Sequence, residues 1–221
     1  MKENREENNL EIKEVVNKAE DFIVKNQRTL IIVVSVILVA VLGYFGVKKF
    51  HLEPKEKQAA EIAFGAENYF GQGNYELALK GDGKFLGFVD IVDGYSSTKA
   101  GNLAKYYAGI SCLKLGQFDD AVSYLTSYKG KDTFTKVLAI IGAGDAYMEL
   151  GNTSEAISWY EKASKYKENE VTAPYALFKL GLAYYANQES QKALETFNSI
   201  KTNYPNAAEV RELDKYIALV E

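Results

Sequence analysis

The chain has 221 residues, of which 47% are apolar and 25% charged, and it contains three prolines, so its composition excludes wholesale disorder. Its net charge is −4, and the part beyond residue 50 is more acidic still, with 18 basic and 23 acidic residues, so general binding to a nucleic-acid backbone is not expected. One cysteine and one histidine exclude an intrachain disulfide framework, a zinc site with paired histidines and a nucleophile activated by an internal histidine. We therefore expect no enzyme activity, no cofactor and no metal.

The first distinctive segment is an uncharged stretch, residues 29–47, bounded by Arg28 and Lys48. As a helix it would be roughly 28 Å long, about the thickness of the hydrocarbon core of a bilayer. A buried core helix rarely lacks a polar face over five turns, and no small-residue cleavage site of a signal peptide follows the stretch. We therefore predict a retained transmembrane helix. Basic residues are balanced on its two sides, so the positive-inside rule does not predict its orientation.

Residues 1–28 form an N-terminal segment whose apolar side chains fall on one helical stripe. The stripe consists of Ile12, Val15, Val16, Ala19, Phe22 and Ile23. The opposite face carries both acids and lysines, which favours a short amphipathic helix at the membrane surface. A docking helix for a membrane partner is the alternative.

Residues 48–57 are charged and contain Pro54, which suits a short linker, and beyond them the chain repeats itself. The repeats align on one alanine each, with separations of 43, 35 and 37 residues: Ala78, Ala121, Ala156 and Ala193. Around each alanine, glycines and aromatic residues recur at similar offsets. In the last unit these are Gly181, Tyr184, Phe197 and Pro205.

These residues resemble the tetratricopeptide repeat (TPR) signature, a helix–turn–helix unit of about 34 residues. Small residues let the two helices approach closely, and aromatic side chains fill the space between them. We expect an all-α protein, in which a transmembrane helix precedes a TPR α-solenoid of about four repeats within residues 58–221. Residues 206–221 place four apolar side chains on one side and predict a capping helix: Val210, Leu213, Ile217 and Val220.

The first repeat departs from the pattern after Ala78, where residues 80–84 read KGDGK. Two glycines interrupt a helix here, and the helix is expected to resume with apolar residues at helical spacing: Phe85, Phe88, Val89 and Val92. A phosphate-binding loop is not expected, because no strand precedes the segment. Cys112 occupies a packing position in the second repeat, so we expect a buried thiol without chemical function.

In TPR arrays the concave surface is lined by fixed positions of each first helix, and transferring these positions identifies a candidate protein-binding groove. The ten residues are Phe70 in the first repeat, Tyr106, Ile110 and Leu113 in the second, Ile141, Asp145 and Met148 in the third, and Tyr175, Phe178 and Tyr185 in the fourth. This lining is mostly apolar and aromatic, and the Lys and Asn set of carboxylate-clamping TPR domains is missing. An apolar partner segment, extended or helical, is therefore expected. Burial by the capping helix or packing between repeats is the alternative for each of these side chains.

The order of a short N-terminal segment, one membrane span and a TPR domain resembles bacterial single-pass TPR proteins of the YfgM type. That resemblance implies an ancillary, chaperone-like subunit of the SecYEG translocon, partnered by a membrane-anchored peptidyl-prolyl isomerase and open to exported chains. It also implies the bacterial inner membrane, with a cytoplasmic N-terminus and a periplasmic TPR domain. The alternatives are a TPR receptor or assembly factor facing the cytosol, which Lys48 and Lys49 suit, and an enzyme with an unrecognised Asp/Lys site.

Overall fold

The computed structural model describes residues 17–18, 20 and 22–220, and the chain divides into two compact units, Met1–Pro54 and Lys55–Glu221. Four positions of the predicted N-terminal stripe, Ile12, Val15, Val16 and Ala19, lie outside the described residues. The other two, Phe22 and Ile23, are helical and exposed.

The first unit contains the long apolar helix α2 (Gln27–Val47) and the short π-helix η1 (Lys48–Leu52). No residue of α2 is buried, and its side chains are apolar on every face. In the described part of the chain, the one helical stretch long and apolar enough to cross a membrane is Gln27–Gly71, which contains α2. Residues 48–57, expected as a linker, are helical throughout. A helix that is apolar on every face is usually buried in a protein core or in a membrane. Because α2 is not buried in the described structure, its surface suits a membrane.

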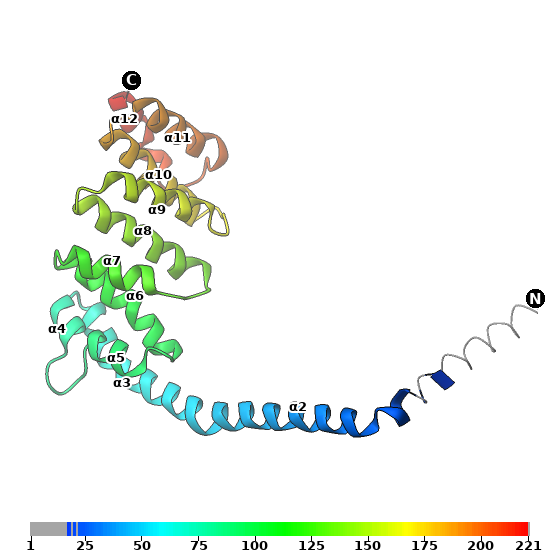
Figure 1. Cartoon of the computed structure of the whole chain (residues 1–221). Coiled ribbons are helices and arrows are strands. Elements are labelled where there is room, and N and C mark those ends of the chain that lie inside the picture. The colour runs from blue at the N-terminus through cyan, green and yellow to red at the C-terminus, as the bar shows by residue number, and fades with distance from the viewer. Residues whose placement is uncertain (1–16, 19, 21, 221) are drawn as a thin grey trace, which may run out of the picture. The chain divides into compact units, whose positions relative to one another are not determined.

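The second unit is a stack of helices, and Figure 1 shows its helices following one another in chain order up to the C-terminal end. Its first repeat contains α3 (Glu53–Gly71), which begins two residues before the unit, α4 (Tyr75–Lys80) and α5 (Phe88–Tyr95). The next three repeats are the helix pairs α6 (Lys99–Lys114) with α7 (Phe118–Ser127), α8 (Thr133–Glu149) with α9 (Thr153–Lys165), and α10 (Thr172–Ala186) with α11 (Ser190–Asn203). The last helix is α12 (Val210–Val220). The predicted all-α architecture is confirmed.

Within each regular repeat, one glycine of the first helix receives a large side chain of the second helix. A Cβ atom added to Gly109 would lie 2.5 Å from Leu125, one on Gly144 2.6 Å from the Tyr160 ring, and one on Gly181 2.3 Å from the Phe197 ring. The four repeat-defining alanines, Ala78, Ala121, Ala156 and Ala193, are fully buried. The close helix contact predicted from the small residues is confirmed, and large side chains of the second helices pack against the glycines.

The first helices of the second and third repeats begin at side-chain caps. The hydroxyl of Thr98 accepts the N–H of Gly101 at 2.9 Å, and the carboxylate of Asp132 accepts the N–H of Thr135 at 2.7 Å. In addition, Glu56 on α3 accepts the backbone N–H groups of Lys99 and Ala100 at 2.7 and 3.1 Å. This carboxylate satisfies two open donors at the positive end of α6 and ties α3 to the second repeat.

The first repeat contains a turn where a continuous second helix would otherwise lie. Helix α4 ends at Lys80, Gly81 takes a φ of 77°, and Gly81 pairs with Leu86 across an isolated antiparallel bridge before α5 begins. Phe85, expected at a helical position, therefore lies in this turn, and its ring covers Gly65 of α3. The turn holds the ring in the place that a second-helix side chain takes in the other repeats, because α4 is too short to supply one.

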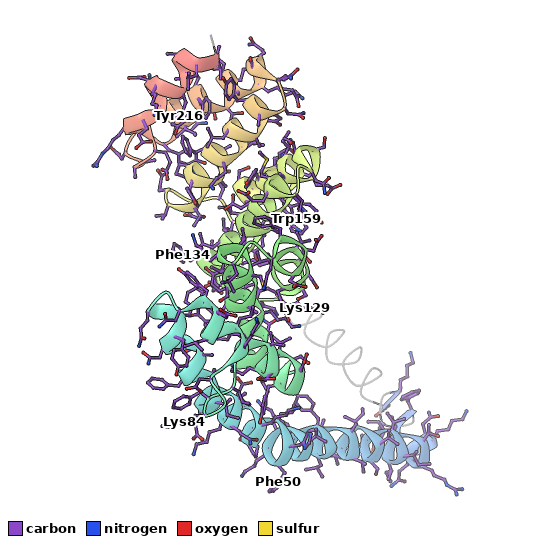
Figure 2. The ribbon with its side chains drawn as sticks, turned by 90° about the vertical axis from the view of Figure 1, so that its left-hand side faces the viewer. Phe50, Lys84, Lys129, Phe134, Trp159 and Tyr216 are labelled. Atoms are coloured by element: carbon purple, nitrogen blue, oxygen red, sulfur yellow. The ribbon has the colours of Figure 1, made fainter. Side chains whose placement is uncertain are left out.

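Helix α12 covers the apolar end of the stack, as predicted for a capping helix (Figure 2). Leu213 is fully buried, and Val210, Ile217 and Val220 pack against the fourth repeat. Tyr216 on the same helix lies edge-on to Phe178 of α10, with ring centroids 5.0 Å apart. The cap removes the fourth repeat's apolar face from water.

Candidate protein-binding groove

The first helices of three consecutive repeats, α6, α8 and α10, line an open groove with a volume of about 640 Å³. That volume lies in the range of roughly 300–1,000 Å³ that is usual for ligand clefts. Most of the lining is apolar or aromatic: Tyr106, Ile110, Leu113, Phe118, Leu138, Ile141, Met148, Tyr175 and Leu182. Helix α8 contacts both α6 and α10, so its side chains form the middle of the groove and those of α6 and α10 form its two sides.

The structure brings seven of the ten predicted groove residues together in this one groove. They are Tyr106, Ile110, Leu113, Ile141, Asp145, Met148 and Tyr175. All seven come from the second repeat, the third repeat and the first turns of α10. That these residues bind a partner remains a prediction.

The other three predicted residues lie outside the groove. Phe70 packs between the first and second repeats, with its ring 5.5 Å from that of Tyr75 on α4 and 4.9 Å from that of Tyr107 on α6. Phe178 packs beneath the cap against Phe197 and Tyr216, and Tyr185 is 43% exposed.

The physical reason is the same for Phe70 and Phe178. Each ring packs in an interface between helices, because that interface removes more of its apolar surface from water than the groove does.

The polar centre of the groove is the carboxylate of Asp145. Its Oδ1 atom accepts a hydrogen bond from the Tyr160 hydroxyl at 2.6 Å and one from the Lys179 ammonium at 3.0 Å. Both side chains of the Asp145–Lys179 ion pair are 28% exposed. Among the described residues, no hydrogen bond reaches Oδ2 of Asp145. One acceptor and part of a lysine ammonium group are thus left for a ligand.

The pKa values of the groove residues follow from this arrangement. Burial lowers the pKa of Lys179, but the charge and hydrogen bond of Asp145 outweigh burial, so the pKa is raised overall. Burial and Asp145 both raise the pKa of Tyr160, and burial raises that of Tyr106. Lys179 is therefore charged and both tyrosines are neutral at physiological pH. The groove also contains Lys114 and Glu149, which are exposed, so its four charged side chains sum to zero.

Sequence reasoning missed Lys179, Leu182, Leu138 and Tyr160. The first three could have been found, because Tyr175, Lys179 and Leu182 continue the alternating spacing of four and three residues seen along α8. Tyr160 comes from a second helix, and nothing in its local pattern shows that its hydroxyl reaches a groove carboxylate.

Two further features concern chemistry rather than binding. Cys112 is buried, as predicted, and burial followed by the charge of Asp120 raises the pKa of its thiol to about 11, so the thiol is unreactive at neutral pH. In the part of the chain that the structure describes, no group of three or more His, Cys, Asp or Glu is arranged to hold a metal ion.

The C-terminal part of the helical stack matches known families. Residues 144–188 match a TPR repeat family, and residues 175–207 match a tetratricopeptide repeat family. The chain is also 27% identical over 103 residues to a TPR repeat-containing protein of Methanocaldococcus jannaschii, a match that covers 47% of this chain and 17% of that relative. The molecule is thus, first, an all-α stack of helix pairs. More narrowly, residues 144–207 match TPR repeats, and one long apolar helix lies near the N-terminus.

Proposed function

We propose that this protein is a membrane-anchored scaffold that binds a segment of a partner protein in the groove between α6, α8 and α10. The observation that carries the proposal is the groove itself, in which apolar side chains from three repeats surround one ion pair. Apart from the buried Ile141, these apolar side chains are partly exposed, and a bound partner would remove the rest of their surface from water. The unburied apolar helix α2 supports the anchor, because a bilayer covers all of its faces.

The finer proposal concerns the partner and the compartment. The resemblance in domain order to translocon-associated TPR proteins supports an accessory role at a SecYEG-type channel, with a membrane-anchored peptidyl-prolyl isomerase or exported chains as groove ligands. In that proposal the TPR domain faces the periplasm of a bacterial inner membrane. The alternative is a receptor or assembly factor facing the cytosol, for which Lys48 and Lys49 next to α2 are the supporting observation.

The groove is tested by purifying the full-length protein from membranes and quantifying the proteins that come with it. The double variant Tyr106→Ser/Tyr175→Ser removes two aromatic walls of the groove, whereas Tyr185→Ser removes an exposed tyrosine outside it. We expect the double variant to lose groove partners at unchanged helical content, and the control to keep them. Equal partner sets in all three samples would reject the groove.

The compartment and the channel need separate measurements. A reporter enzyme that is active only in the periplasm, fused to Glu221, distinguishes the two orientations. Absence of translocon components from the wild-type sample would reject the finer proposal while leaving the scaffold intact.

A further inference from the structure

We propose that the ligand of the groove is an amphipathic α-helix of about four turns, with one amide side chain, Asn or Gln, near the middle of its apolar face. This inference rests on the proposed function and names the class of its ligand. Three features of the groove carry it: the spacing along α8, the small number of uncharged hydrogen-bonding side chains in the lining, and the ion pair at the centre.

The side chains along the middle of the groove follow the spacing of a helix–helix seam. Leu138, Ile141, Asp145 and Met148 of α8 line the groove at intervals of three, four and three residues. Phe134 continues the stripe four residues earlier, at the first turn of α8, where it is 58% exposed at the margin of the stack (Figure 2). From Phe134 to Met148 the stripe is about 21 Å long, the length of four helical turns. Alternation of four and three is the spacing by which two helices pack along each other at a shallow angle.

The three helices around the groove also suit a fourth. Packed helices lie roughly 8–10 Å apart. Because α6 and α10 both contact α8, a helix lying over α8 has one of them on each side. Tyr106, Ile110 and Leu113 would face one flank of the ligand, and Tyr175 and Leu182 the other.

An extended ligand fits this lining poorly, because its backbone N–H and C=O groups need partners when they leave water. The residues that line the groove include no Asn, Gln, Ser or Thr, the uncharged side chains that usually bond to a backbone. The Tyr160 hydroxyl and Oδ1 of Asp145 are already bonded to each other, so the uncharged side-chain groups left for a ligand backbone are the Tyr106 and Tyr175 hydroxyls, fewer than an extended segment needs. A helix bonds its own backbone internally and needs none of these groups.

The ion pair at the centre selects the side chain opposite it. Oδ2 of Asp145 offers an acceptor, and the Lys179 ammonium offers donors beside it. An amide side chain carries both a donor and an acceptor and can satisfy both partners. A lysine of the ligand would be repelled by Lys179, and a glutamate of the ligand would be repelled by Asp145. A leucine would cover the ion pair without replacing the hydrogen bonds that the pair makes to water. A single polar residue in an apolar seam also fixes the register of the two helices.

The test uses the full-length protein in lipid nanodiscs and fluorescent peptides of about 16 residues. The parent peptide repeats leucine at alternating three- and four-residue spacing, with asparagine at the central apolar position. Matched peptides replace the asparagine by leucine, glutamate or lysine, and a fifth places proline at two interior positions, which prevents a helix. Fluorescence anisotropy measures each Kd.

We expect the asparagine peptide to bind about tenfold more tightly than its leucine, glutamate and lysine counterparts, and the proline peptide not to bind. The Lys179→Met protein keeps the Asp145 carboxylate but lacks its lysine partner. The lysine peptide should therefore bind this variant most tightly. The wild-type protein with five peptides keeps the test valid if this variant fails to fold.

Equal affinities for the four helical peptides would overturn the amide assignment, and binding of the proline peptide would overturn the helix. Failure of all peptides would also reject this ligand class. In each of these cases the proposed function stands if Tyr106→Ser/Tyr175→Ser still loses its partners, and falls only if it does not.

Discussion

Substituting alanine for Gly144 should destabilise the protein, although alanine is the better helix former. An exposed Gly→Ala change inside a helix gains about 1 kcal/mol in helix propensity. At Gly144 the new Cβ would lie 2.6, 2.9 and 3.0 Å from three atoms of the Tyr160 ring. Tyr160 is 2% exposed, and its hydroxyl is bonded to Asp145, so the ring cannot move aside without losing that bond.

The magnitude follows from setting these effects against each other. Overpacking of a close-packed core costs about 1–3 kcal/mol. Loss of the Tyr160–Asp145 hydrogen bond adds about 1 kcal/mol. After subtraction of the propensity gain, Gly144→Ala should lower the free energy of unfolding by about 1–3 kcal/mol.

Gly142 provides a matched control on the same helix. A Cβ there would lie 3.0, 3.3 and 3.5 Å from terminal methyl groups of Leu125, Ile110 and Leu113, and such methyl groups can yield by a few tenths of an ångström. Gly142→Ala should therefore leave stability within about 0.5 kcal/mol of wild type or raise it, because the propensity gain offsets the mild contact.

Urea denaturation of residues 55–221, followed by circular dichroism, measures both changes. An increase in stability for Gly144→Ala, equal to that of an exposed helical glycine, would refute the reasoning. It would mean that Tyr160 is not held between the two helices.

Three further predictions concern the domain as a whole. Residues 55–221 alone should be soluble and unfold cooperatively. Deletion of residues 206–221 should lower the urea midpoint of unfolding, because it exposes the side chains that Leu213 covers. An unchanged midpoint would contradict the capping role of these residues. Gln188→Gly should stabilise the domain by about 0.5–1 kcal/mol in the same assay. Gln188 has a φ of 61°, a left-handed conformation that Gly116 and Gly151 adopt after the first helices of the two preceding repeats, with φ of 73° and 75°. A loss of stability would mean that Gln188 is not strained. Burial raises the pKa values of Tyr128, Tyr184 and Tyr204 to about 12, with their Asp or Glu partners adding to the shift. These tyrosines therefore stabilise the fold fully below pH 10 and lose that contribution as the pH rises through 12; ultraviolet titration that shows all tyrosines ionising at pH 10 in the folded protein would contradict the prediction.

The repeat architecture could be predicted from the sequence because its determinants are local. The alanines and glycines at the helix contacts recur at a fixed offset, and each contact joins two helices that follow each other in the chain. The turn at residues 81–87 was harder. Two glycines show that a helix ends, but the place where Phe85 comes to lie depends on Gly65 of another helix.

The structure places all three predicted α8 residues in the groove lining but only one of the three predicted on α10, for a physical reason. Lys179 lies in the groove lining on α10 and Phe178 is its neighbour in the sequence, but apolar periodicity favours Phe178. A first helix in this fold buries two faces, one against its own repeat and one against the next. The most apolar positions are therefore taken by the interior, and a lysine remains for the groove. Only the stacking of repeats brings Lys179 to Asp145, 34 residues away.

The Asp145–Lys179 pair also bears on why the groove contains charge at all. A partly exposed ion pair adds little to stability, and apolar residues of similar volume would hold α8 and α10 together at least as well. The Tyr160 hydroxyl nevertheless donates a hydrogen bond to this carboxylate, and Asp145 is the one polar residue among the groove positions Leu138, Ile141, Asp145 and Met148 of α8. The ion pair contributes little to the fold and lies at the centre of the proposed binding surface. We therefore expect it to act on the choice of ligand. It excludes a uniformly apolar segment and accepts one with a polar residue at the matching place.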